Sequence, residues 1–265
     1  MNQIGYDVAI PGNHEFDYDN EMSDIVDDRL AWVNEQLGSV VAQSAVGLTI
    51  NDPNALDDAG KPVRIIRCAE TNLGDLIADA FRVRSGAEVG VACAGSIRKG
   101  LPKGSVTLSD VLSTYPFDNG IVMARVTGQQ ILNALEWGAR MVPEESGSFL
   151  QVSGMTYEIH TDIPSGCKND ENGLFTGVEG EYRVKNVMIG GEPLEPDRLY
   201  TLASQGFTLL NHGDCQTAFD GARTIWQSDV PDYGVVAAYL LEDLNGIVGE
   251  DYADPYGQGR IVAVG

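Results

Sequence analysis

Apolar side chains recur every three or four positions near residue 30, and this spacing predicts a helix. Leu30, Val33, Leu37 and Val40 share one face of that helix. The pattern then breaks, because a stretch with Asn, Asp, Gly and two prolines follows at residues 51–62. We interpret this stretch as a loop and place a domain boundary there.

Beyond the loop, the pattern predicts both strands and helices. Leu73, Ile77 and Phe81 share the apolar face of one expected helix. Thr-x-x-Asp at residues 107–110 and Thr-x-x-Gln at residues 127–130 match capping boxes, which mark helix starts. The fold class predicted is α+β, a layered α/β domain with mixed sheets. Strands are expected at residues 63–66, 89–93, 121–126, 149–152, 155–160, 182–189 and 200–204, and a last helix at 235–240.

The charge balance narrows the range of partners. The 265 residues include 39 Asp and Glu against 17 Lys and Arg, a net charge of −22. Such a surface repels nucleic acid and an anionic membrane, so we expect neither as a partner. A small anionic ligand remains compatible if a few arginines converge locally.

No targeting or membrane-spanning segment is predicted. The chain has no run of 18 apolar residues. Met1 leads directly into Asn-Gln-Ile-Gly-Tyr-Asp, without the basic and then apolar stretch of a secretory signal. The residues alone therefore leave the localisation unknown.

The cysteine spacing argues against a zinc ribbon or a redox motif, because no Cys-x-x-Cys pair occurs. One or two disulfides, or four buried thiols, fit the sequence equally. The cysteines are Cys68, Cys93, Cys167 and Cys215.

The run Gly-Asn-His-Glu-Phe-Asp-Tyr at residues 12–18 is typical of a two-metal phosphoesterase. In it, Asn13 could ligate a metal and His14 could protonate a leaving oxygen, with Asp17 orienting the imidazole. Two ions need about half a dozen ligands, and we find no others in a suitable setting. The only other histidines are His160 and His212.

A second constellation lies at the ends of predicted strands, where ligand sites concentrate. Arg67 and Arg98 could grip a phosphate or carboxylate by paired donors. Phe117 and Phe207 could sandwich a planar base, with each stacked base contributing about 1–3 kcal/mol. Asp214 is suited to accept hydrogen bonds from ribose hydroxyls. Taken alone, a Phe after Pro is more often a core anchor.

The chain contains four motifs in this order: Arg67 with Glu-Thr-Asn-Leu-Gly-Asp-Leu-Ile-Ala-Asp-Ala (70–80), Cys-Ala-Gly-Ser-Ile-Arg (93–98), Pro-Phe-Asp-Asn (116–119), and Phe207 with Asn-His-Gly-Asp (211–214). Together they resemble the C-terminal domain of the 5′-nucleotidase family, which includes UDP-sugar hydrolases. The resemblance covers roughly residues 30–262. Residues 4–18 resemble the end of the same family's N-terminal metallophosphatase domain.

The resemblance implies a division of labour between two domains. The N-terminal domain of these enzymes holds two divalent metals of the zinc, manganese or cobalt type, and the C-terminal domain holds the nucleoside. Family members are usually periplasmic, secreted or on the cell surface. Carried over to this chain, the resemblance implies substrate contacts at Arg67, Arg98, Phe117, Asn119, Phe207 and Asp214, a catalytic pair at His14 and Asp17, and a metal ligand at Asn13.

Four departures from the family pattern affect the residues that the resemblance assigns. The family's Gly-Gly-Gly-Ile-Arg is replaced by Ala-Gly-Ser-Ile-Arg at residues 94–98, and Cys93 stands where Asn is common. The spacing from Phe207 to Asp214 is one residue longer than usual. The family's Gly-Gly-Asp becomes His-Gly-Asp at residues 212–214.

The sequence therefore predicts a domain that binds a nucleoside or nucleotide. It divides into a metallophosphatase remnant (1–28), a linker helix and loop (29–60) and the nucleotide-binding domain (61–265). We expect no cofactor in this chain and no catalysis by it alone, because most of the two-metal site is missing. Two alternatives remain open: a non-catalytic nucleoside-binding module, and an assembly domain that self-associates through residues 1–28.

Overall fold

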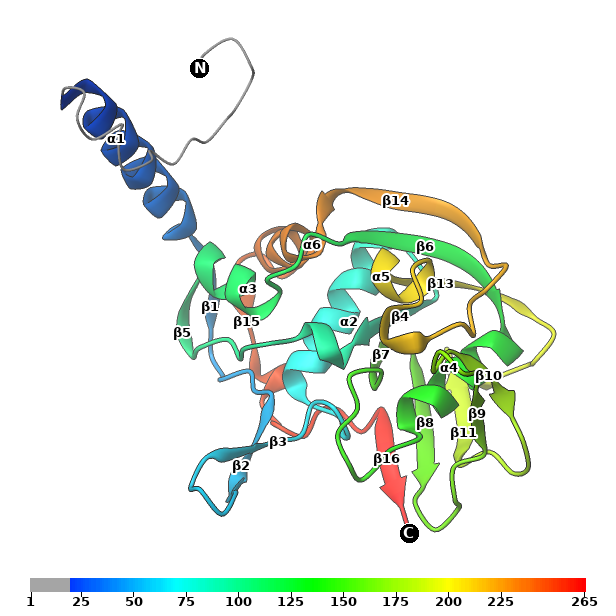
Figure 1. The fold of residues 1–265 in the computed structure, drawn as a ribbon. Helices are drawn as coiled ribbons and strands as arrows, with labels where there is room; N and C mark the ends of the chain where they lie inside the picture. The colour runs from blue at the N-terminus through cyan, green and yellow to red at the C-terminus, as the bar shows by residue number, and fades with distance from the viewer. Residues whose placement is uncertain (1–19) are drawn as a thin grey trace. The chain divides into compact units, whose positions relative to one another are not determined.

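Figure 1 shows the fold in a computed structural model, which describes residues 20–265. Helix α1 (Asn20–Leu37) belongs to a unit that ends at Ser39, and Val40–Gly265 form a second, compact unit. The helix predicted around residue 30 is confirmed. It ends before Val40, which begins a strand instead of extending the helix.

The second unit is built on a five-stranded mixed sheet with the order β14-β6-β13-β4-β7. β13 runs parallel to β4, and the other neighbouring pairs are antiparallel. Every residue of β4 is buried, which fits its place inside the sheet. The strands are β4 (Val89–Cys93), β6 (Gly120–Thr127), β7 (Leu150–Ser153), β13 (Leu199–Gln205) and β14 (Arg223–Pro231).

Smaller sheets flank this one. A four-stranded sheet has the order β12-β11-β8-β16, a three-stranded sheet has the order β15-β1-β5, and two further strand pairs are β2 with β3 and β9 with β10. The predicted α+β class with mixed sheets is confirmed. The strands are β1 (Val40–Ser44), β2 (Asn51–Leu56), β3 (Pro62–Arg64), β5 (Gly104–Thr107), β8 (Met155–His160), β9 (Cys167–Asn169), β10 (Phe175–Val178), β11 (Val184–Ile189), β12 (Glu192–Pro193), β15 (Ile247–Val248) and β16 (Ile261–Val264).

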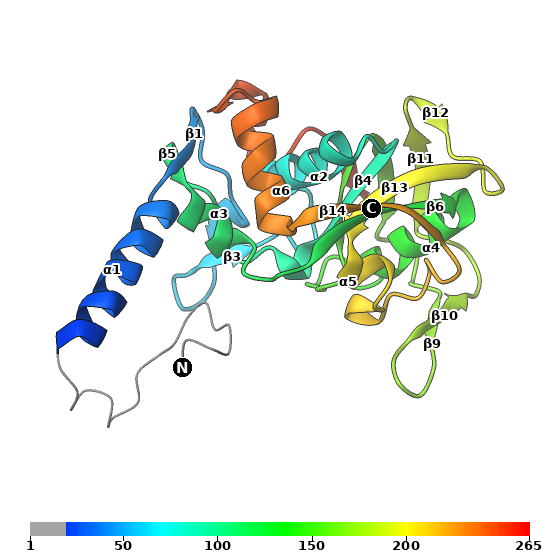
Figure 2. The same cartoon turned by 90° about the horizontal axis from the view of Figure 1, so that it is seen from above.

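Helices lie on both faces of the central sheet, as Figure 2 shows for α2 and α6 on one side and α4 and α5 on the other. α2 is the most buried of them, and its apolar residues Leu73, Ile77 and Phe81 are fully buried. Both predicted capping boxes are present, at the starts of α3 and α4. The helices are α2 (Asn72–Ser85), α3 (Leu108–Thr114), α4 (Gly128–Ala139), α5 (Gly206–Leu209) and α6 (Asp232–Ala238), which continues into a π-helical turn at Tyr239–Asp243.

The compact unit begins at Val40 and not at residue 61, where the sequence placed the start of the binding domain. β1 pairs with β5 and also with β15, some two hundred residues later in the chain. Residues 51–64 form the hairpin of β2 and β3. Long-range pairing of this kind leaves no local signal in a stretch rich in Asn, Asp and Pro.

The Glu-Thr-Asn run before α2 fastens distant segments together. Glu70 accepts hydrogen bonds from the backbone N–H groups of Gln258 (2.6 Å) and Ile261 (2.7 Å). The amide of Asn72 donates to the carbonyl of Tyr252 (2.9 Å). Because buried polar groups are costly unless paired, these bonds fix the C-terminal segment against α2. This motif therefore stabilises the fold and does not line the site described next.

The topology brings three loops to one edge of the central sheet. β4 and β13 are parallel, so Cys93 and Gln205, their last residues, point to the same edge. β6 is antiparallel to β13, and its first residues pair with the end of β13. The loops that follow β4, precede β6 and follow β13 therefore meet there.

Candidate functional site

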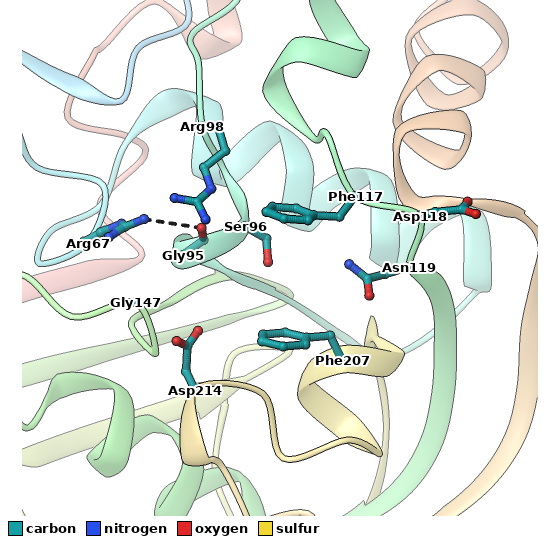
Figure 3. Close-up of a pocket in the computed structure, with 10 residues that line it drawn as sticks. All are labelled: Arg67, Gly95, Ser96, Arg98, Phe117, Asp118, Asn119, Gly147, Phe207 and Asp214. Carbon is teal, nitrogen blue, oxygen red and sulfur yellow. Dashed lines mark hydrogen bonds between the residues drawn. The ribbon is translucent and has the colours of Figure 1, made fainter. Parts of the chain in front are cut away.

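A cleft of about 450 Å³ lies at this edge of the sheet (Figure 3). It brings together all of the residues predicted to contact a substrate. Ser96 and Asp118 come from the same motifs, whereas Gly147 belongs to none of them and had no sequence signal. The lining residues are Arg67, Gly95, Ser96, Arg98, Phe117, Asp118, Asn119, Gly147, Phe207 and Asp214.

Two arginines lie at one end of the cleft. The Nη2 atom of Arg67 donates to the carbonyl of Gly95 (3.4 Å), whereas its buried Nε has no hydrogen-bond partner among the described residues. Burial lowers the pKa of Arg67, and the positive charges of Arg64 and Arg98 lower it further. An anion placed between Arg67 and Arg98 would offset this repulsion and take up the free donor.

Two aromatic rings face each other across the cleft (Figure 3). Phe117, in the turn before β6, is 38% exposed, which is unusual for a residue meant only to anchor a core. Phe207 lies on the short helix α5 and packs against Gly213, where a Cβ atom would come within 2.3 Å of the ring. The two rings leave a slot open to solvent that suits a flat aromatic group.

Asp214 forms the acidic end of the cleft, beside Gly95 and Gly147 and on the same side of the aromatic rings as the arginines (Figure 3). Its backbone is left-handed (φ 51°), as are His212 (φ 52°) and Cys215 (φ 62°). The indole N–H of Trp137 donates to the Asp214 carbonyl (3.0 Å) and holds this turn. Left-handed backbone is costly for residues other than glycine, so a turn with three such residues depends on surrounding contacts like this one.

Glycines give the Asp214 carboxylate its space. A Cβ atom on Gly147 would lie 2.8 Å from Oδ1 of Asp214, and one on Gly95 would lie 3.0 Å from Oδ2. Both distances are shorter than a normal contact. The backbone N–H of Gly95 also donates to the carbonyl of Gly147 (2.8 Å), which keeps the two glycines side by side.

Behind the aromatic slot, Asn119 is coupled to a buried acid. Its Nδ2 lies 3.5 Å from Oδ2 of Asp232, and the Asp232 N–H donates to the Asn119 carbonyl (2.8 Å). Burial raises the pKa of Asp232 to about 7, despite hydrogen bonds that lower it. Asn119 is thus held from behind while its amide reaches the cleft.

The family model described as "5′-nucleotidase, C-terminal domain" matches residues 40–221 of this chain. The chain belongs to this family.

Curated relatives agree with this assignment. A 5′-nucleotidase of Vibrio parahaemolyticus is 30% identical over 198 residues, which are 75% of this chain and 31% of that protein. A trifunctional nucleotide phosphoesterase protein of Bacillus subtilis is 34% identical over 161 residues, 54% of this chain and 11% of the relative. The chain thus spans less than a third of the length of the relatives it matches.

A solved structure supports the fold as well. The 5′-nucleotidase precursor of Thermus thermophilus matches with a TM-score of 0.69 and 26% identity, over 91% of this chain and 43% of the other. A sulfate thiohydrolase from the same genus, with a TM-score of 0.62 and 21% identity, shows only that the fold is shared.

The resemblance to 5′-nucleotidases implies two divalent metals. Within them, no three His, Cys, Asp or Glu side chains are grouped so as to hold a metal ion. His160 pairs with Glu158 (3.0 Å) and His212 with Asp220 (2.7 Å), and neither histidine lines the cleft. The described part of the chain therefore does not fit a two-metal centre.

The remaining predictions concern the start of the chain. Asn13, His14 and Asp17 lie outside the described residues, and so does most of the 1–28 segment proposed for self-association. None of the helices in the described part is long and apolar enough to cross a membrane.

Proposed function

We propose that this domain binds a nucleoside or nucleotide in the cleft, with the base between Phe117 and Phe207 and the ribose at Asp214. The phosphate lies near Arg67 and Arg98. The observation that carries the proposal is the common cleft of about 450 Å³, which all of these side chains line although they come from separate segments.

The order of chemistry along the cleft supports this orientation. The arginines suit a phosphate and the aromatic slot suits a base, and Asp214 lies on the arginine side of the two rings, where the ribose that joins base and phosphate would sit. Family membership supports the nucleotide class of ligand. The Nε atom of Arg67, which is buried without a partner in the described residues, supplies a donor that a bound anion would satisfy.

We further propose that this chain alone binds its ligand without hydrolysing it. In a two-metal hydrolase the ions stabilise both the attacking and the leaving oxygen, and the protein must supply a cage of ligands for them. The described residues contain no such group. Residues 1–19 add Asn13 and His14, which are too few for two ions.

Titration calorimetry with adenosine and AMP tests the proposal. We expect dissociation constants from about 100 μM to a few millimolar, because one stacked base and one held phosphate leave only a few kcal/mol after the cost of association. Phe117→Ala should weaken both ligands about tenfold, whereas Arg98→Ala should weaken AMP more than adenosine.

Matched controls come from outside the cleft. Tyr256 is exposed like Phe117 (43% against 38%), so Tyr256→Ala should leave binding unchanged. Arg84 bonds to Glu242 and Asp243, so Arg84→Ala removes an arginine without touching the cleft. Binding that persists in the double variant Phe117→Ala/Arg98→Ala would place the site elsewhere, and no binding at several millimolar would refute the proposal.

A further inference from the structure

The buried thiol of Cys93 contacts Asp214 at the acidic end of the cleft. Cys93 is the last residue of β4 and is 1% exposed. Its Sγ lies 3.1 Å from Oδ2 of Asp214 and 3.1 Å from the carbonyl oxygen of Gly147. All four cysteines are free thiols in the structure, so this sulfur carries its own hydrogen.

That hydrogen stays on the sulfur over the physiological pH range. Burial raises the pKa of Cys93 well above the usual value for a thiol, and the negative charge of Asp214 raises it further. A protonated thiol has a single hydrogen to donate. Of its two neighbours, the carboxylate is the stronger acceptor, because a charged partner shortens and strengthens a hydrogen bond.

Few other contacts restrict the Asp214 side chain. Asp214 is exposed and lies in the left-handed turn after α5. Gly147 and Gly95 border the carboxylate on one side, and among the described residues neither donates a hydrogen bond to it. The described residues give the Asp214 carboxylate one hydrogen-bond donor, and that donor is the Cys93 thiol.

We propose that Cys93 is a positioning residue, whose thiol donates to Asp214 and fixes the carboxylate for the ribose hydroxyls. The inference rests on the proposed function and deepens it, since it gives the domain a means to prefer ligands that carry ribose hydroxyls. A hydrogen bond to Oδ2 leaves Oδ1 and the outer face of the carboxylate available to the ligand. Cys93 itself does not line the cleft.

Calorimetry with two ligands separates positioning from simple packing. Adenosine carries the ribose hydroxyls, whereas 2′,3′-dideoxyadenosine lacks them but keeps the base. Cys93→Ala should weaken adenosine about three- to tenfold and leave dideoxyadenosine within about twofold. Cys93→Ser, which keeps a donor, should restore most of the adenosine affinity. Cys68→Ala is the control, because the Cys68 thiol bonds only to the nearby Ile65 carbonyl in the described residues.

The double variant Cys93→Ala/Asp214→Ala provides a second comparison. It should bind adenosine as Asp214→Ala alone does, because a positioning residue has no effect without the group that it positions. An equal loss for both ligands, no rescue by serine, or a full additional loss in the double variant would overturn the inference. Thermal melting of each variant verifies that it is folded.

Infrared spectroscopy tests the contact without any ligand. The S–H stretching band of Cys93 is assigned from the difference between the wild type and Cys93→Ser. Asp214→Ala should move this band to higher frequency, because the strong acceptor is lost and the Gly147 carbonyl remains. An unchanged band overturns the positioning inference alone, whereas a wild-type domain that binds neither ligand overturns the proposed function.

Discussion

The guanidinium carbon of Arg98 lies 5.3 Å from the centre of the Phe117 ring. A cation at this distance is attracted to the face of the ring, by about 0.5–1 kcal/mol at an exposed site. The contact joins the cationic end of the cleft to the aromatic slot. Each of the two side chains therefore helps to fix the orientation of the other.

This contact predicts that the two side chains act as a pair on AMP binding. In a double-mutant cycle of Arg98→Met and Phe117→Leu, the losses should be non-additive by about 0.5–1 kcal/mol. The control cycle pairs Arg98→Met with Phe207→Leu, which should be close to additive. Titration calorimetry measures all the variants, and full additivity in the first cycle would show that the contact does not serve binding.

Gly147→Ala should close the acidic end of the cleft. The new Cβ would lie 2.8 Å from Oδ1 of Asp214 and would push the carboxylate away. We expect adenosine binding to weaken about tenfold or more, with little change in dideoxyadenosine binding. Gly249→Ala is the matched control, since a Cβ there meets nothing within 4 Å. Equal binding of adenosine by the two variants would contradict the geometry of this end.

Asp232 should make the domain less stable as the pH rises from about 4 to about 7. Burial raises its pKa from 3.8 to about 7, so the folded protein keeps a proton that the unfolded chain releases above pH 4. Because the native state binds more protons in this window, stability falls as the pH rises and then levels off. Asp232→Asn should flatten this part of the profile. The melting temperature of the variant minus that of the wild type should therefore be larger at pH 8 than at pH 5.

Arg260 should be a major contributor to stability. Its side chain is 13% exposed, and Nη2 lies 2.8 Å from Oδ2 of Asp79 on α2. Arg260→Ala should lower the free energy of unfolding by about 3–5 kcal/mol, because it leaves a buried carboxylate without its cation. Arg84→Ala breaks more exposed ion pairs with Glu242 and Asp243 and should cost less than about 1 kcal/mol. Urea denaturation of both variants makes the comparison.

The chain alone should not hydrolyse AMP or UDP-sugars when manganese, cobalt or zinc is supplied. The physical reason is the lack of a ligand group for two ions within the described residues. A phosphate-release assay measures this directly. Turnover that depends on the metal and vanishes in His14→Ala would contradict the expectation. It would show that residues around His14 contribute to a catalytic metal site.

The sequence by itself determined the local elements and predicted most of the side chains that line the cleft. Thr107 and Thr127 start α3 and α4 through capping boxes that span four residues, and the apolar spacing after Asn72 produces α2. Such signals depend on neighbours in the chain, so they are present before the chain folds. Most of the cleft side chains lie in short motifs, which can be recognised in the sequence without knowledge of the fold.

Only the tertiary structure decided which distant segments meet. The edge strand β14 has no buried position, so its sequence lacks the alternation of apolar and polar residues that could have predicted it. Gly147 enters the cleft, and the Cys93 thiol reaches Asp214 across 121 positions, because β4, β7 and β13 lie side by side in the sheet. Contacts of this kind depend on the order of the strands in the sheet. That order is a property of the whole fold, so the spacing of neighbouring residues does not reveal it.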